Sequence, residues 1–170
     1  MNRELSKYFI KPMMLLCVIG LMIGGAVTAK AETEFTAKIK EAMAVMKTEA
    51  AKLGEPKLDG SSLFFGTTKM NGNYQLVDDF KTKFGCTATL FVKKNDGYIR
   101  ISTNVLKNGN RAVGTPLDPK GAAIAAINKG EGFYGVVDIL GSQYDTGYEP
   151  IKNAAGEIVG IYYIGFPLKK

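Results

Sequence analysis

A change in the spacing of apolar residues divides the chain into a helical part and a β part. From Glu32 to Leu53 the apolar residues recur every three or four positions, which is the spacing of one face of a helix. Gly54 and Pro56 follow directly and are typical of a helix end. From Cys86 onward the period becomes two and β-branched and aromatic residues are frequent, as in strands. The pattern therefore predicts a long N-terminal helix followed by a sheet.

Turn residues divide the β part into five strands. Asn95-Asp96-Gly97 is a hairpin sequence, and Asn153 to Gly156 joins the last two strands. Between the two hairpins, Asp118 is placed to cap a short helix that begins at Pro119. The five strands are expected at residues 86–94, 98–104, 132–139, 144–151 and 157–166, and before them we expect a short strand at 62–65 and a short helix or irregular crossing at 74–84. The predicted fold class is α+β of the PAS-like type, a long N-terminal helix packed on a five-stranded antiparallel sheet with short helices inserted.

The first 31 residues have the organisation of an export signal. Arg3, Lys7 and Lys11 precede an uncharged, largely apolar run over residues 12–29, and Ala29-Lys30-Ala31 ends it as a small-x-small cleavage sequence. We expect cleavage after Ala31, which leaves residues 32–170 as a single domain that is periplasmic or secreted. The alternative is an uncleaved anchor, because residues 12–29 just reach the length of a membrane span.

Composition excludes several classes of function. The 170-residue chain has no His, no Trp and two Cys, so it cannot hold a Ser-His-Asp or Cys-His catalytic site, an imidazole metal ligand or a zinc cage. We expect no metal, no cofactor and no enzymatic activity. The net charge of +6 halves to +3 without the first 31 residues, and the basic residues are scattered. A scattered basic surface favours solvation over nucleic-acid binding. Cys86 is expected to be a buried apolar residue.

The strand around Arg100 contains the first candidate ligand residues. By alternation, Tyr98, Arg100, Ser102 and Asn104 share the face away from the N-terminal helix. There, Arg100 can receive a carboxylate through its two-pronged donor set. The alternative is a solvent-exposed or structurally paired arginine. The same two interpretations apply to Arg111.

Tyrosine hydroxyls follow on the later strands. Tyr134 shares a face with Asp138, while Tyr144 and Tyr148 share one with Thr146. A pocket for a small polar ligand combines apolar walls with a few convergent donors of this kind. The alternative is that these are core and rim tyrosines, which are common in strands.

Several short motifs follow one another in a fixed order from Thr87 to Gly165. Its members are Thr87 to Phe91, Ile99 to Val105, Asn110 to Asp118, Gly132 to Ile139, Tyr148 to Ile151 and Gly156 to Gly165. Taken together over about residues 33–168, this set resembles the single Cache domain family, the extracytoplasmic sensors of bacterial chemoreceptors and sensor kinases. The resemblance implies a pocket for a small molecule, often a short carboxylate, on the sheet face opposite the long helix. It favours Arg100, Arg111, Tyr134, Tyr144, Tyr148 and Ser102 as ligand-binding residues.

The sequence leaves two kinds of function open. The leading hypothesis is a non-catalytic module that binds or senses a small organic acid and acts with a separate membrane receptor in chemotaxis or signal transduction, because this chain ends shortly after the last strand. The alternative is a structural or interaction module that pairs with a membrane protein, or with itself through the N-terminal helix, without a small ligand.

Overall fold

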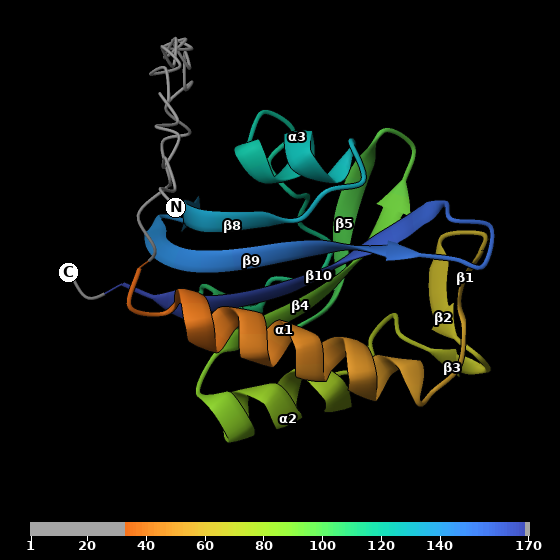
Figure 1. Ribbon diagram of the computed structural model, residues 1–170, viewed down its shortest axis with the longest axis horizontal. Coiled ribbons are helices and arrows are strands. Elements are labelled where there is room, and N and C mark those ends of the chain that lie inside the picture. Colours follow the sequence, from red (N-terminus) through yellow and green to blue (C-terminus); the bar gives the residue numbers. More distant parts are fainter. Residues whose placement is uncertain (1–32, 169–170) are drawn as a thin grey trace, which may run out of the picture. The chain divides into compact units, whose positions relative to one another are not determined.

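The main sheet contains five antiparallel strands. The computed structural model describes residues 33–168, and in that range the strands are ordered β5-β4-β10-β9-β8 (Figure 1). Their bounds are β4 (Thr87–Lys94), β5 (Gly97–Thr103), β8 (Phe133–Ile139), β9 (Ser142–Lys152) and β10 (Ile158–Pro167). The α+β class and the five-stranded antiparallel sheet are confirmed. Each strand begins and ends within two residues of its expected bounds.

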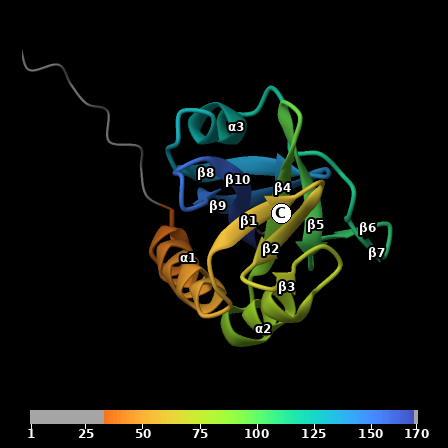
Figure 2. The same cartoon turned by 90° about the vertical axis from the view of Figure 1, so that its right-hand side faces the viewer.

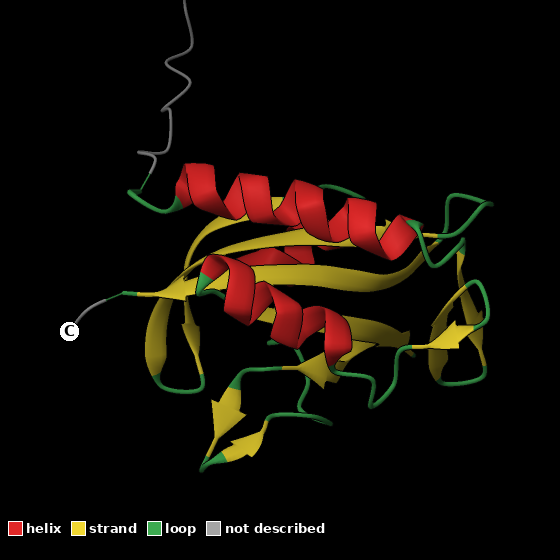
Figure 3. Ribbon diagram, turned by 90° about the horizontal axis from the view of Figure 1, so that it is seen from below, coloured by secondary structure: helices red, strands yellow, loops and turns green. Residues whose placement is uncertain are grey.

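Helices cover both faces of this sheet. Helices α1 (Thr36–Ala51) and α2 (Gln75–Phe84) lie side by side on one face, and α3 (Ala122–Ile127) lies on the other (Figures 1 and 3). The apolar side chains form two buried clusters. The first, between the sheet and α1 and α2, contains Ile39, Met43 and Val77; the second, on the α3 side, contains Phe91, Ile127 and Tyr148. The sheet is therefore buried on both sides, and a ligand cavity on either face has to be enclosed by these covers.

Helix α1 is fixed at its start and along its length. Phe35, just before it, stacks on Phe166 of β10 with ring centroids 5.0 Å apart, and the Thr33 hydroxyl donates to the buried carboxylate of Asp145 on β9. Further along, the helix comes so close to β9 that a Cβ on Gly147 would lie 2.7 Å from Ile39 Cγ2. Glycine at this position therefore allows the close approach of helix and strand.

Two small sheets were not fully expected. Strands β1 (Pro56–Asp59), β2 (Ser62–Phe65) and β3 (Thr68–Lys69) form a three-stranded sheet beside the main one, of which only β2 was predicted (Figure 2). Strands β6 (Leu106–Lys107) and β7 (Asn110–Arg111) form a two-residue ladder around the Asn108-Gly109 turn. Strands this short carry too few residues to show a period of two.

The predicted cap of α3 is wrong. Gly121 is the N-cap, in an extended conformation, and the helix begins at Ala122 rather than at Pro119. Asp118 instead closes a turn: its Oδ1 accepts from the backbone N–H of Lys120 at 2.9 Å, and its carbonyl accepts from Gly121 N–H at 3.2 Å. An aspartate can hydrogen-bond to the backbone two residues on in a turn as readily as it caps a helix, and here the turn is formed.

The predicted export signal, residues 1–31, and the alternative anchor, residues 12–29, lie outside the described residues. Within residues 33–168, each helix is too short or too polar to cross a bilayer.

Candidate functional site

A cavity of about 140 Å³ lies on the α3 face of the sheet. Its walls come from β5, β8, β9 and the segment that runs from Leu117 into α3, and most of them are apolar. Two polar side chains, Arg100 of the edge strand β5 and Tyr148 of β9, also line it. The remaining lining residues are Leu117, Asp118, Gly121, Ala122, Ala123, Val137, Asp138 and Ile139. Apolar walls with a few convergent polar groups are typical of small-molecule sites.

The segment after β7 holds Arg100 in place. Gly114 turns the chain with φ of +81°, so that residues 114–117 run back along the edge of β5. The backbone N–H of Arg100 then donates to Thr115 O at 3.0 Å, and its guanidinium Nη1 donates to Thr115 Oγ1 at 2.9 Å and to Pro116 O at 3.3 Å. The guanidinium carbon lies 4.9 Å from the centre of the Phe91 ring. The side chain is therefore oriented before any ligand arrives.

Arg100 is buried without a matching negative charge. Only 5% of its surface is exposed, it forms no ion pair among the described residues, and its Nε is a buried donor without an acceptor in that part of the chain. Burial lowers the pKa of the guanidinium, and the nearby hydroxyls of Tyr148 and Tyr163 partly oppose this effect. A buried donor without a partner costs about 1–3 kcal/mol, more when it is charged. An anionic ligand in the cavity would supply the missing negative charge.

Tyr148 contributes a second donor to the cavity. The residue is buried, its ring packs on Tyr163 with centroids 5.0 Å apart, and its hydroxyl has no hydrogen bond within residues 33–168. Burial raises the pKa of this hydroxyl, which therefore stays protonated and able to donate at neutral pH. Tyr144 lies on the same face of β9 in the same cluster, but it is not among the residues that line the cavity.

Two charged cavity residues were not predicted as ligand residues. Asp118 precedes α3 and Asp138 lies near the end of β8, and both are exposed. From the sequence, Asp118 was expected to cap a helix, and Asp138 was noted only for sharing a face with Tyr134.

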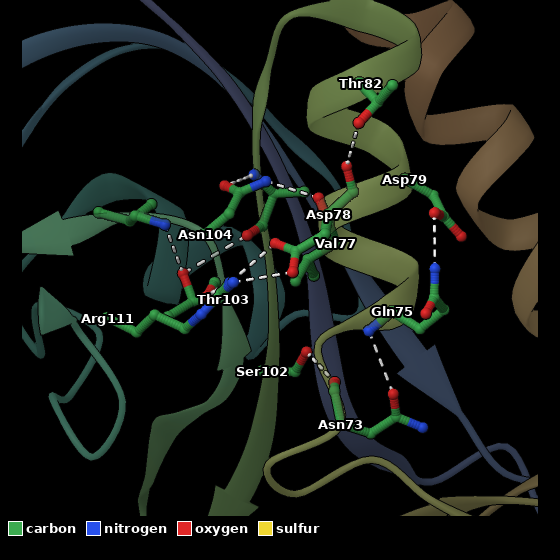
Figure 4. A network of polar contacts seen from close by, with 12 residues as sticks. Asn73, Gln75, Val77, Asp78, Asp79, Thr82, Ser102, Thr103, Asn104 and Arg111 are labelled. Atoms are coloured by element: carbon green, nitrogen blue, oxygen red, sulfur yellow. Dashed lines mark hydrogen bonds and ion pairs between the residues drawn. The ribbon is translucent and has the colours of Figure 1, made fainter.

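A β-bulge separates Ser102 from Arg100. Phe91 of β4 pairs with Arg100, but Leu90 pairs with Ser102, so Ile101 is an extra residue in β5. The alternation changes phase there, and the prediction that Arg100, Ser102 and Asn104 share a face is wrong. Ser102 Oγ donates to Asn73 O and Asn104 Nδ2 donates to Val77 O, both on the α2 side (Figure 4). Ser102 therefore lies outside the cavity.

Arg111 also lies away from the cavity. Its guanidinium forms a two-pronged pair with Asp78 of α2, at 2.8 and 2.7 Å, and Nη1 donates to Thr103 O at 2.8 Å (Figure 4). The guanidinium carbon is 4.4 Å from the centre of the Tyr74 ring. The hydrogen bond with Asp78 is the main reason that the pKa of Arg111 is raised. This arrangement matches the structurally paired alternative and attaches the β6–β7 turn to α2.

Tyr134 faces α1, not the cavity. Its hydroxyl donates to Glu149 of β9, and Glu149 also accepts from Lys47 of α1. Burial and the neighbouring carboxylate raise the pKa of Tyr134. Hollows of about 460 and 490 Å³ lie beside these residues, larger than the cavity at Arg100. They are broad and open to solvent, and the charged groups of Lys47 and Glu149 beside them already pair with each other, so the small cavity is the better candidate site.

Cys86 is buried as expected. Its thiol approaches Phe80 O at 3.6 Å, and burial raises its pKa to about 11. Within the described part of the chain, no three side chains of Cys, Asp or Glu are grouped so as to hold a metal ion.

The sheet order and the helical covers are those of an α+β domain of PAS-like type. The family model described as the Cache 3/Cache 2 fusion domain matches residues 25–170, and the chain belongs to this family. No curated protein matches the sequence. Membership makes the protein an extracytoplasmic sensor or ligand-binding domain, and it agrees with the Cache resemblance found in the sequence.

Proposed function

We propose that the protein binds a short organic carboxylate in the cavity at Arg100 and acts as a non-catalytic sensor or binding module. The observation that carries this proposal is the buried Arg100 guanidinium, which lines the cavity and has no carboxylate partner among residues 33–168. Arginine binds carboxylates through parallel hydrogen bonds, and such bonds gain strength where water is excluded. Tyr148 supplies a neutral donor on the neighbouring wall.

The size of the cavity limits the ligand. A volume of about 140 Å³ is below the roughly 300–1,000 Å³ of pockets that hold drug-sized ligands, so the cavity suits a small ligand. Acetate, propionate, pyruvate and lactate are of this kind, whereas purines are larger. We therefore place the ligand among organic acids of two to four carbons.

The predicted leader fits this function. With cleavage after Ala31, residues 32–170 form one Cache domain that is periplasmic or secreted. Such a domain would deliver its signal through a separate membrane receptor, in chemotaxis or another form of signal transduction. Sequencing the N-terminus of the exported protein tests the cleavage. A mature chain that still carries residues 12–29 would favour the anchor instead.

A calorimetric titration tests the ligand. The purified protein is titrated with acetate, propionate, pyruvate, lactate, dicarboxylates, amino acids and purines, next to Arg100→Gln and the matched variant Arg111→Gln. We expect a short carboxylate to bind the wild type and Arg111→Gln, and its affinity for Arg100→Gln to fall at least 100-fold, because a two-pronged charged contact is lost. Equal binding by Arg100→Gln would refute the assignment of the site.

Homodimerisation through the N-terminal helix stays a prediction. The outward side of α1 carries charged residues such as Lys38 and Glu41 beside small ones such as Ala44, all exposed in the single chain. Light scattering on the purified protein tests it, since a dimer would show twice the mass of the chain. An interaction module without a ligand would be favoured if a dimer formed and the carboxylates did not bind.

A further inference from the structure

The charged side chains that line the cavity lie at different depths. The buried Arg100 guanidinium is on the β5 wall, whereas the exposed carboxylates of Asp118 and Asp138 lie on the walls that come from the α3 segment and from β8. Because Arg100 is 95% buried and the two aspartates reach solvent, the positive charge is at the inner end and the negative charges are at the mouth. A ligand whose carboxylate sits on Arg100 must point its other end toward these aspartates.

Both carboxylates are held in turns. Asp118 Oδ1 accepts from Lys120 N–H at 2.9 Å, and Asp138 Oδ1 accepts from Gly141 N–H at 2.8 Å, in the turn between β8 and β9. Within residues 33–168 neither aspartate forms an ion pair, and neither Oδ2 makes a hydrogen bond. Each turn therefore fixes one oxygen and leaves the other for a group at the mouth.

We propose that Asp118 and Asp138 make the cavity selective by charge: it favours a carboxylate that carries an ammonium group at its other end and disfavours one that carries a second carboxylate. This inference rests on the proposed carboxylate site at Arg100. A ligand ammonium group at the mouth is attracted by both aspartates, and a second carboxylate is repelled by both. An exposed charge pair changes an affinity by up to about fivefold, so two aspartates together separate the two ligand classes by about tenfold or more.

Three ligands that share one skeleton isolate this effect. Propionate, β-alanine and succinate all contain a carboxylate on a two-carbon chain, and they end in a hydrogen, an ammonium group and a second carboxylate. Calorimetric titration of the purified protein should give the affinity order β-alanine, propionate, succinate, with at least tenfold between the first and the last. Raising the salt to about 0.5 M should compress this order, since screening weakens exposed pairs.

The variants Asp118→Asn, Asp138→Asn and the double variant remove the charge but keep the Oδ1 acceptor that closes each turn. We expect each single variant to weaken β-alanine binding by up to about fivefold and to strengthen succinate binding, with propionate nearly unchanged. Asp59→Asn is the matched control, because it removes the same charge from the exposed β1–β2 turn, which does not line the cavity. It should leave the order unchanged.

The outcomes separate the two proposals. If succinate binds as tightly as β-alanine, or if the double variant keeps the wild-type order while Arg100→Gln abolishes binding, the charge selectivity is overturned and the carboxylate site stands. If none of the three ligands binds the wild type, the charge selectivity is overturned as well. The absence of binding across the whole carboxylate panel overturns both.

Discussion

Replacing Arg100 by methionine should leave the ligand-free protein as stable as the wild type or make it more stable. Burial of an ion costs several kcal/mol in real proteins, and Arg100 has no counter-charge among the described residues to offset it. Against this gain, the variant loses two hydrogen bonds, to Thr115 and Pro116, at about 1 kcal/mol each, and the contact with the Phe91 ring, at about 1 kcal/mol. Methionine fills much of the same space with an unbranched apolar chain. The expected net change in the free energy of unfolding is about +1 kcal/mol.

Urea denaturation of the two proteins without ligand measures this change, and a thermal scan should show a rise in Tm of about 4 °C. With a carboxylate at about 100 times its Kd, the wild type should gain about 2.7 kcal/mol and Arg100→Met nothing. Arg111→Met is the matched control: it breaks a paired contact, so it should lower stability and keep the ligand response. If Arg100→Met loses more than about 2 kcal/mol without ligand and still responds to the carboxylate, the guanidinium is structural and the reasoning fails.

Three further predictions concern the scaffold. A double-mutant cycle on Arg111→Ala and Asp78→Ala should give a coupling free energy of about 1 kcal/mol. This coupling should shrink in 1 M salt because the pair is partly exposed, and a coupling near zero would contradict the structural role of the pair. Gly147→Ala should lower the free energy of unfolding by about 1–3 kcal/mol in a urea titration, because the added Cβ overpacks the contact with α1, whereas Gly97→Ala, where the nearest contact is 3.9 Å away, should change it little. Burial raises the pKa of the Cys86 thiol to about 11, so between about pH 9 and pH 11 the thiol keeps its proton in the folded protein and loses it in the unfolded chain. The contribution of the thiol to the free energy of unfolding is therefore full below about pH 9 and is lost as the pH rises to about 11. The difference in the free energy of unfolding between wild type and Cys86→Ala should therefore shrink by up to about 3 kcal/mol over this pH range. A difference that does not change with pH would contradict the burial of the thiol.

Much of the architecture could be predicted because it depends on local periodicity. The change from a spacing of three and four residues to a spacing of two at Cys86 marks the boundary between helix and sheet, and the Asn95-Asp96-Gly97 turn defines the β4–β5 hairpin. The location of Arg100 on the face away from α1 followed from the same alternation, starting from the apolar neighbours Ile99 and Ile101.

The composition of the site could not be predicted in the same way. The bulge at Ile101 leaves no mark in the hydrophobic pattern, because an isoleucine suits either side of the strand, so Ser102 was placed on the wrong face. Arg111 is paired with Asp78, which is 33 residues earlier in the sequence, and spacing does not reveal such a pair. Asp118 and Asp138 both line the cavity because the segment before α3 folds over the sheet face beside β8, which depends on the tertiary structure alone.

The extra residue in β5 determines how sequence changes in this strand affect the two faces of the sheet. Residues on either side of Ile101 follow two alternation frames that are out of step by one. Before it, Arg100 faces the cavity; after it, Ser102 and Asn104 anchor the α2 side. Deleting Ile101 would remove the extra residue and leave Arg100 opposite Phe91 and Ser102 opposite Leu90, as they are now. A one-residue gap at this position in a related sequence therefore keeps the same side chains at the cavity, although the strand is shortened by little more than 3 Å.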